Sequence, residues 1–465
     1  MNSRSSATLH IQSLAIPASC ELSDIFQHFA NEPWAMLLDS AGKQHQDSRF
    51  DIMVAQPVAT IVSKNHVNQV WQQGMASYTT SGNPLALLEQ LQNQLLGAYS
   101  ADHHPELPFL AGALGYFAYD LGRYFEVLPE QHTEHYASPD MAVGLYSWSV
   151  IKDRHSGQFF LSWLDNYPAL PAQYFEQLSQ QTGNPATFRL TSPWQANLSE
   201  SEYQQKLQTI DAYLRAGDCY QINFAQRFSA QYQGDEWQAF LALKAANQAP
   251  FSAFIRLPET AILSISPERF LALKQGNVQT KPIKGTRPRS SDPLSDEQAK
   301  DCLFNSPKDR AENLMIVDLL RNDLSKHCEP HSVQVPSLFA IESFAAVHHL
   351  VSTVTAKLAA HSNAFSLFQG AFPGGSITGA PKIRAMQIID ELEPHKRNIY
   401  CGSIGYFGIR QDMDSSICIR TLLCEKQHIY CWAGGGIVLD SKATEEYQES
   451  LDKVAKILPL LSQLA

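Results

Sequence analysis

Residues 281–287 read Lys-Pro-Ile-Lys-Gly-Thr-Arg, and a related run, Ser-Pro-Glu-Arg-Phe, comes before them at 266–270. The segment has the alternation of strands, and Gly276-Asn277 between the two runs favours a hairpin turn. We therefore expect a hairpin that holds Glu268 and Lys284 on neighbouring strands. In such a place a lysine amine could act as a nucleophile beside a carboxylic acid that donates a proton. On spacing alone, an ordinary surface ion pair is the simpler interpretation.

Composition limits the kind of protein. With 465 residues, 44% of them hydrophobic, the chain can bury a large core. The net charge of -11 argues against a nucleic-acid surface, so an anionic substrate would need a locally positive pocket. The eight cysteines show no Cys-x-x-Cys pair and no zinc spacing, which favours the reducing cytosol. We find no apolar run near the roughly 18 residues that span a bilayer, and no signal peptide.

The linker signals divide the chain into two regions. Polar stretches with proline at residues 128–139 and 165–193 are the best linker candidates, and we place a boundary near 190. This gives an N-terminal region at 1–190 and a second domain at 191–465. Ser199-x-x-Glu202 is a capping box and Gly217 a stop signal, which predicts a helix between them.

The second region continues with further expected elements. Residues 308–324 have the pattern of a buried helix, and a Gly434–Gly436 turn should precede a last helix at 443–458. Strand-like runs lie at 219–228, 399–409, 416–423 and 428–433.

Three glutamates on these expected helices are candidate metal ligands. Glu446 and Glu449 are three residues apart and share a face, and Glu312 is an acidic residue among apolar neighbours at 314–317 that should be buried. Carboxylates that converge from different helices suit Mg²⁺. For Glu446 and Glu449, an exposed acidic face remains the alternative.

Two further groups could bind anions. Residues 373–382, Pro-Gly-Gly-Ser-Ile-Thr-Gly-Ala-Pro-Lys, offer backbone N–H groups with Thr378 and Lys382 beside them, but Ala380 stands where a nucleotide-binding P-loop needs lysine. Tyr406 and Arg420 on predicted strands, with the glycine turn, form a plausible carboxylate clamp. An arginine on an exposed strand face would give the same pattern.

Jointly these motifs resemble the chorismate-utilising enzymes, the family of anthranilate synthase component I, from about Trp34 to the C-terminus. The resemblance implies an α+β fold, one large interleaved body of packed antiparallel β-sheets with helices outside. The motifs that carry it are 266–270, 282–286, 309–323, 348–352, 373–382, 434–438 and 446–449.

Single positions indicate the branch of the family. Lys284 is typical of the aminodeoxychorismate synthases, whereas anthranilate synthases have alanine there. Isochorismate synthases use a lysine base at the position that corresponds to Gln221, and glutamine cannot do that work. The implied reaction converts chorismate and ammonia to 4-amino-4-deoxychorismate, in the para-aminobenzoate branch of folate synthesis.

The resemblance also implies roles for the reacting groups. Lys284 would attack the ring while the ring hydroxyl leaves, protonated by Glu268, and ammonia would then displace the lysine. Thr286, His349 and Thr378 would orient the ring. Ammonia would come from a separate glutamine amidotransferase subunit, since the chain has no recognisable Cys-His glutaminase motif.

The family pattern supplies ligand positions as well. Mg²⁺ would bind Glu312 and Glu449, with Glu446 acting through water. The two substrate carboxylates would meet positively charged or N–H groups, at Lys382, Tyr406, Arg420 and Gly436. A buried tryptophan pocket, occupied but with doubtful regulation, would be lined by Ser40, Asp47, Ser48, Arg49, Phe50, Pro250, Phe251 and Ser252.

Two other functions stay open from sequence. Anthranilate synthase component I is the alternative enzyme. A catalytically idle scaffold that only binds a glutaminase is the alternative outside enzymes, although the intact Lys284, Glu268, Glu312 and Glu449 argue against it.

Overall fold

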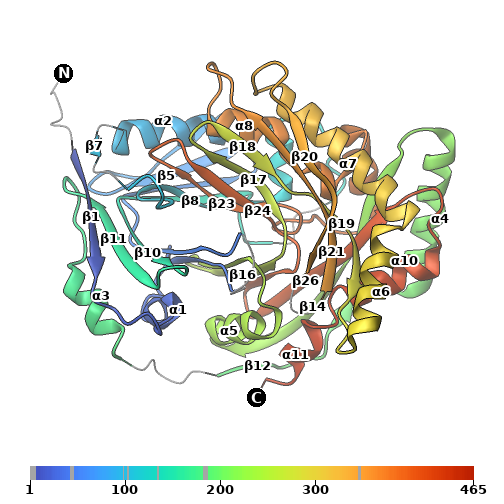
Figure 1. The fold of residues 1–465 in the computed structure, drawn as a ribbon, viewed down its shortest axis with the longest axis horizontal. Helices are drawn as coiled ribbons and strands as arrows, with labels where there is room; N and C mark the ends of the chain where they lie inside the picture. Colours follow the sequence, from blue (N-terminus) through green and yellow to red (C-terminus); the bar gives the residue numbers. More distant parts are fainter. Residues whose placement is uncertain are drawn as a thin grey trace.

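The computed structural model describes residues 7–41, 47–97, 99–101, 104–132, 136–181, 187–343 and 347–464. Two large, mainly antiparallel sheets form the body of the molecule, and helices lie around the outside (Figure 1). A hydrophobic core that includes Ile52 and Ile255 of one sheet and Ile61 and Leu114 of the other fills the space between the sheets. The predicted α+β architecture is therefore confirmed.

Within the described residues the first sheet has fourteen strands. Its order is β12 (Phe188–Leu190), β14 (Gln221–Gly234), β26 (His428–Ile437), β25 (Thr421–Glu425), β16 (Thr260–Ser266), β15 (Phe251–Arg256), β2 (Met36–Asp39), β3 (Phe50–Val54), β10 (Trp148–Asp153), β11 (Gln158–Leu164), β1 (Ala7–Leu14) and β7 (Tyr99–Ala101), with β13 (Gln195–Ala196) and β22 (Gly379–Ala380) also paired to β14.

The second sheet has twelve strands in the described part of the chain. Its order is β19 (Ile283–Pro288), β21 (Val347–Lys357), β18 (Asn277–Thr280), β17 (Arg269–Lys274), β24 (Met413–Ile417), β23 (Ser403–Gly408), β8 (Gly112–Phe117), β9 (Met141–Tyr146), β4 (Ala59–Lys64), β5 (Val67–Gln72) and β6 (Tyr78–Ser81), with β20 (Gln334–Ser343) also paired to β21. Both sheets mix strands from the two sides of residue 190. The domain boundary there stays a prediction.

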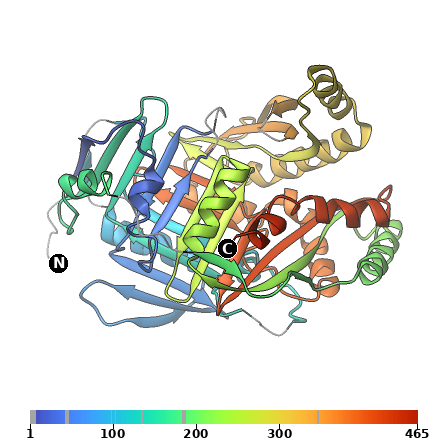
Figure 2. The same ribbon diagram turned by 90° about the horizontal axis from the view of Figure 1, so that it is seen from below.

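The helices gather on the outer surfaces of the sheets. Figure 2 shows α6 and α7 in yellow and α4 in green at one end of the molecule, with the blue N-terminal strands at the other. The α-helices are α1 (Leu22–Phe26), α2 (Pro84–Leu96), α3 (Ala172–Leu178), α4 (Glu200–Ala216), α5 (Glu236–Asn247), α6 (Pro293–Phe304), α7 (Pro307–Ser325), α8 (Ala364–Ala371), α9 (Lys382–Leu392), α10 (Ala443–Asp452) and α11 (Leu458–Ser462). In this part of the chain no helix is both long and apolar enough to cross a membrane.

The predicted hairpin forms, but its strands end sooner than expected. β17 pairs with β18 through a turn at Gln275-Gly276 rather than the predicted Gly276-Asn277, and both turn residues have positive φ angles, 51° and 75°. The second strand then stops before Pro282, which has no N–H to continue the ladder, and β19 pairs with β21 instead. Glu268 lies just before β17 and Lys284 lies in β19, so the prediction that both lie on hairpin strands is wrong.

Two helix predictions are confirmed and two details are wrong. The capping box at Ser199 forms, and α4 ends where Gly217 takes a left-handed conformation. α7 covers the predicted 308–324, but Leu314 is 52% exposed, so that stretch is not buried throughout. The last predicted helix ends at Asp452 rather than 458, and the short α11 follows it.

Candidate active site

Lys284 and Glu268 meet at Ser376. The Lys284 ammonium donates a hydrogen bond to the Ser376 carbonyl at 3.1 Å, and the Ser376 hydroxyl donates one to Glu268 Oε1 at 2.7 Å. Ser376 belongs to the short helical turn η2 (Gly375–Ile377) of the glycine-rich run. The turn thus joins an amine from β19 to a carboxyl that precedes β17.

Burial shifts both groups toward their neutral forms. It raises the pKa of the Glu268 carboxyl to about 7, against the opposing effects of the Ser376 hydrogen bond and the Lys284 charge. It also lowers the pKa of the half-buried Lys284 amine, against the opposing charges of Glu312 and Glu268. A protonated carboxyl beside a neutral amine is the combination that nucleophilic attack with acid assistance requires.

Thr286 and His349 lie on the same strand pair as Lys284. They face each other across β19 and β21, and Thr286 Oγ1 is 2.8 Å from His349 Nδ1. The structure therefore places Thr286 and His349 on the strand pair that carries Lys284, and Glu268 just before β17.

Glu446 and Glu449 converge over a glycine. Both project from α10 toward β26, where a Cβ added at Gly435 would lie 3.0 Å from Glu446 Oε2 and 3.4 Å from Glu449 Oε1. Glu312 Oε1 on α7 is buried without a hydrogen-bond partner among the described residues, and burial raises the pKa of this carboxyl, opposed by the charges of Lys284 and Lys308. A buried carboxylate oxygen without a partner indicates that this position suits a bound cation.

The donor set suits Mg²⁺, but lysines contact two of the carboxylates. Lys308 Nζ lies 3.3 Å from Glu446 Oε1, and Lys453 Nζ lies 2.7 Å from Glu449 Oε1. Across the part of the chain that the structure describes, no three acidic, histidine or cysteine side chains are already arranged to hold a metal. The three glutamates therefore have the oxygen donors that a hard cation needs. Two of them would have to leave their lysines before they could bind it.

Gly434–Gly436 are strand residues, so the predicted turn is wrong. They lie in β26 opposite β14, and Gly436 pairs with Asn223. A Cβ at Gly434 would overlap the Phe224 carbonyl, and one at Gly436 would overlap the Gln221 amide. These close approaches explain the glycines better than turn geometry does.

Gln221 is fully buried at the start of β14. Neither its amide oxygen nor its amide nitrogen has a hydrogen-bond partner within the described residues. Buried polar atoms are nearly always satisfied, so this amide beside Gly436 indicates room for a polar ligand.

Arg420 lies between β24 and β25, not on a strand as predicted. Its φ angle is 52°, and its carbonyl accepts a hydrogen bond from the Ile265 N–H, three residues before Glu268. Burial lowers the pKa of its guanidinium. A desolvated guanidinium is a candidate ligand for a substrate carboxylate.

Two of the predicted substrate ligands have hydrogen-bond partners within the chain. Lys382 Nζ is 2.7 Å from Asp323 Oδ2 and donates to the Ala371 carbonyl at 2.9 Å. The Thr378 hydroxyl turns back to donate to the Gly374 carbonyl at 3.1 Å. Tyr406, on β23, lines a separate cavity, and its clamp with Arg420 stays a prediction.

That separate cavity matches the predicted tryptophan pocket. It has a volume of about 200 Å³, and Arg269 crosses it, bonding Asp47 at 2.6 Å and Asp414 at 3.0 Å while stacking on the Phe251 ring. Ser48 is buried but does not line it. The other predicted residues all do, namely Ser40, Asp47, Arg49, Phe50, Pro250, Phe251 and Ser252.

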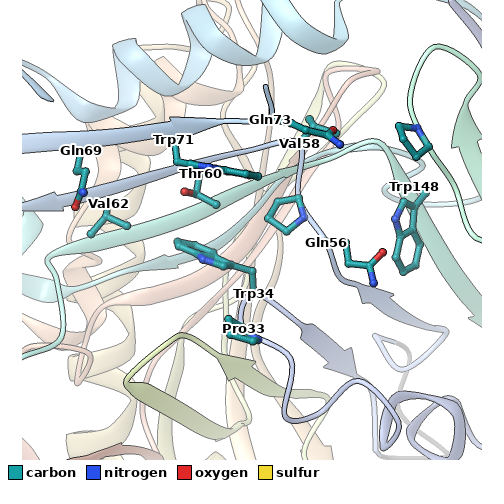
Figure 3. A pocket seen from close by; sticks show the side chains of 12 residues that line it. Pro33, Trp34, Gln56, Val58, Thr60, Val62, Gln69, Trp71, Gln73 and Trp148 are labelled. Carbon is teal, nitrogen blue, oxygen red and sulfur yellow. The ribbon is translucent and has the colours of Figure 1, made fainter. Parts of the chain in front are cut away.

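A third hollow, of about 540 Å³, lacks the chemistry for a charged substrate. Figure 3 shows Trp34, Thr60 and Trp71 around it, and its lining of tryptophan, proline, valine, threonine and glutamine includes no charged side chain. A dianion would be desolvated there without compensation. The region around Lys284, where Lys308 and Lys453 add positive charge, is the better candidate.

Comparison with known proteins shows the family of the chain. The chorismate binding enzyme family matches residues 34–459. The chain is a chorismate-binding enzyme.

Its relatives cover nearly the whole chain. Aminodeoxychorismate synthase component 1 of Klebsiella aerogenes is 55% identical over 435 residues, 93% of this chain and 95% of that protein. The protein of the same name from Escherichia coli K12 is 50% identical over 94% and 95%. The crystal structure of anthranilate synthase component I from Streptococcus pneumoniae TIGR4 has a TM-score of 0.75 at 30% identity, covering 89% of this chain and 93% of that one.

Four residues of the candidate site in this chorismate-binding enzyme were not predicted from the sequence. Lys453 had a signal, because it stands four residues after Glu449 on one helix face. Ser376 had a weaker one, its place in the glycine-rich run. For Lys308 and the buried amide of Gln221 only the folded structure gives the reason, since their contacts come from distant elements.

Proposed function

We propose that the chain is component I of an aminodeoxychorismate synthase, which converts chorismate and ammonia to 4-amino-4-deoxychorismate for para-aminobenzoate and folate synthesis. The observation that carries the proposal is the Lys284–Ser376–Glu268 arrangement. The names of its 55% and 50% identical relatives support it.

The reaction uses the two neutral groups together. The Lys284 amine attacks the ring carbon next to the one that bears the carboxylate, and a C–N bond forms as the C–O bond of the ring hydroxyl breaks. Glu268 gives its proton to the leaving oxygen, which departs as water. Ammonia then displaces the Lys284 nitrogen and enters where the hydroxyl was. The resulting carboxylate of Glu268 accepts a proton from the attacking nitrogen, so the acid is restored.

Other residues of the chain bind and orient the substrate. Thr286 and His349 form one hydrogen-bonded pair on the strands that carry Lys284. This pair presents fixed polar groups to the substrate ring. Arg420 takes the enolpyruvyl carboxylate, and the Gly436 N–H together with the Gln221 amide takes polar atoms at the ring. Lys382 would join them only after leaving Asp323.

Glu312, Glu446 and Glu449 would hold Mg²⁺, which supplies positive charge for the ring carboxylate. The fit rests on the partnerless oxygen of Glu312 and on the two carboxylates that converge over Gly435.

The proposal also covers the partner subunit, bound tryptophan and the cellular location. A glutamine amidotransferase subunit supplies ammonia, and the two chains form a heterodimer. Tryptophan fills the cavity around Arg269. The division into regions 1–190 and 191–465 is part of the same proposal. The cytoplasm is the proposed location, in keeping with eight cysteines that are all free thiols in the described residues.

One experiment tests the proposed activity. Purified chain is mixed with chorismate, MgCl₂ and ammonium chloride, and the products are separated by chromatography with fluorescence and mass detection. We expect 4-amino-4-deoxychorismate, and glutamine should replace ammonia only when an amidotransferase subunit is added. Formation of anthranilate would instead support the alternative enzyme, and no loss of chorismate would support the idle scaffold.

A further inference from the structure

Lys308 reaches from the first turn of α7 to a buried carboxylate on α10. Its ammonium lies 3.3 Å from Glu446 Oε1, to which the Ser441 hydroxyl also donates at 2.6 Å. The Lys308 side chain is 47% exposed, whereas that of Glu446 is only 3% exposed. A partly hydrated cation therefore neutralises a carboxylate that has almost no access to solvent.

The neighbouring carboxylate has a lysine of its own, but one that is held differently. Lys453 Nζ lies 2.7 Å from Glu449 Oε1 and also donates a hydrogen bond to the Gly434 carbonyl of β26 at 2.7 Å. A Cβ at Gly435 would lie 3.6 Å from Lys453 Nζ. Lys453 is thus fixed to β26 as well as to its carboxylate, whereas the long, half-exposed stem of Lys308 can withdraw into water.

A metal and an ammonium cannot share these oxygens. Mg²⁺ needs oxygen ligands at about 2.0–2.1 Å in nearly octahedral geometry, and a neighbouring ammonium repels it. Glu446 is the most buried of the three proposed ligands, so leaving it without any cation would be unfavourable. The observed pair gives it a cation from within the chain.

We propose that Lys308 is a tethered cation that occupies Glu446 when no metal is bound and that Mg²⁺ displaces. The inference rests on the metal ligands of the proposed function and adds an internal competitor to them. It means that the metal affinity of the free enzyme is set by a side chain that is not itself a ligand, and that binding of Mg²⁺ releases Lys308 toward solvent at the start of α7.

Calorimetric titration of the full chain with MgCl₂ alone tests this. Lys308→Met removes the competitor, so Mg²⁺ should bind about two- to fivefold more tightly, the range expected when a partly exposed ion pair is lost. Lys308→Arg keeps the charge and should stay near wild type. Lys300→Met is the matched control, because Lys300 pairs with Glu297 on the exposed surface of α6.

Thermal unfolding supplies a second measurement. Without metal, Lys308→Met should unfold at a lower temperature than wild type because Glu446 is buried without a counter-charge, and saturating Mg²⁺ should raise its midpoint more than it raises that of wild type. If Lys308→Met does not fold, Lys308→Gln serves in both measurements. Unchanged or weaker Mg²⁺ binding by the folded variant would overturn the proposal. Absence of binding by wild type would instead remove the metal assignment itself.

Discussion

The Ser376 carbonyl holds the Lys284 ammonium at 3.1 Å while the Ser376 hydroxyl holds the Glu268 carboxyl at 2.7 Å. One residue therefore fixes the distance between the proposed nucleophile and the proposed acid. Asn223 Nδ2 donates to the same carbonyl at 3.3 Å, and Arg397 donates to the carbonyls of Ile377 and Asn223 at 3.0 and 2.7 Å, which ties the turn to β14. The turn is thus held rigidly against β14. Single substitutions of Glu268, Ser376 and Lys284 should therefore change the reaction in different ways.

Glu268→Gln should lower kcat by about 10²- to 10⁴-fold, the usual contribution of a general acid. In wild type the acid must be protonated, so kcat should fall as pH rises through about 7, the raised pKa of Glu268. Steady-state rates with ammonia held at constant free-base concentration measure both effects. A variant with the wild-type rate would exclude Glu268 as the acid.

The same pKa predicts how stability depends on pH. Because burial raises the pKa of Glu268 from 4.5 to about 7, the native state keeps a proton that the unfolded state loses in between. The contribution of this group to stability is complete below about pH 4.5 and is lost as pH rises through about 7. Urea unfolding of wild type and Glu268→Gln across this window should show a smaller pH slope in the variant; equal slopes would contradict the raised pKa.

Ser376→Ala should move the pH profile rather than only reduce the rate. The hydroxyl hydrogen bond lowers the pKa of Glu268, so its loss should raise that pKa further, by up to about one unit for an ordinary hydrogen bond. The falling limb of kcat should shift to higher pH by the same amount. Ser325→Ala is the control, since that hydroxyl bonds only the Asn322 carbonyl among the contacts described at the end of α7. An unmoved limb would mean that Ser376 does not tune the acid.

Glu312→Gln and Glu449→Gln should each weaken Mg²⁺ binding by at least about tenfold, since even changes outside the ligand shell often cost that much. Glu445→Gln gives the matched control, because Glu445 points away on the same helix to pair with Lys442. Calorimetry with MgCl₂ measures the binding, and activity should vanish with excess chelator. Full activity in chelator would remove the metal from the mechanism.

Local signals in the sequence were sufficient for some elements. The capping box at Ser199 and the left-handed Gly217 depend only on neighbours in the chain, so α4 was predicted correctly at both ends. Lys284, Glu268, Thr286 and His349 followed as candidates from family resemblance. The fold places three of them on β19 and β21 and Glu268 just before β17.

The errors arose where distant contacts decide the structure. The composition of Gly434–Gly436 predicts a turn. In the structure, glycine is needed there because Phe224, Gln221 and Glu446 approach the backbone closely. Nothing local in the sequence shows that Arg420 lies between β24 and β25, with its carbonyl accepting a hydrogen bond from the distant Ile265 N–H. Lys382 could not be matched to Asp323 from sequence, because that pair joins α9 to α7.

Lys284→Ala should abolish the covalent route, and this is the prediction on which the choice of enzyme depends. Burial lowers the pKa of the Lys284 amine, which favours the neutral form that can attack. A tethered amine also gains from being intramolecular, by up to about 7–11 kcal/mol in well-oriented cases. The variant loses both, but it keeps Arg420 and the three glutamates, so chorismate and Mg²⁺ should still bind. Ammonia could then attack the ring directly, next to the carboxylate-bearing carbon, and some anthranilate-type product should form.

The decisive measurement is mass spectrometry of the intact chain after mixing with chorismate and MgCl₂ without ammonia, followed by peptide mapping. Wild type should carry an adduct on the peptide that contains Lys284, and Lys284→Ala should carry none, while the surface control Lys300→Ala should react as wild type does. The adduct should disappear when ammonia is added, because ammonia displaces the lysine nitrogen. If Lys284→Ala made 4-amino-4-deoxychorismate at the wild-type rate, the amine of Lys284 would have no part in bond formation, and its hydrogen bond to Ser376 would be structural only.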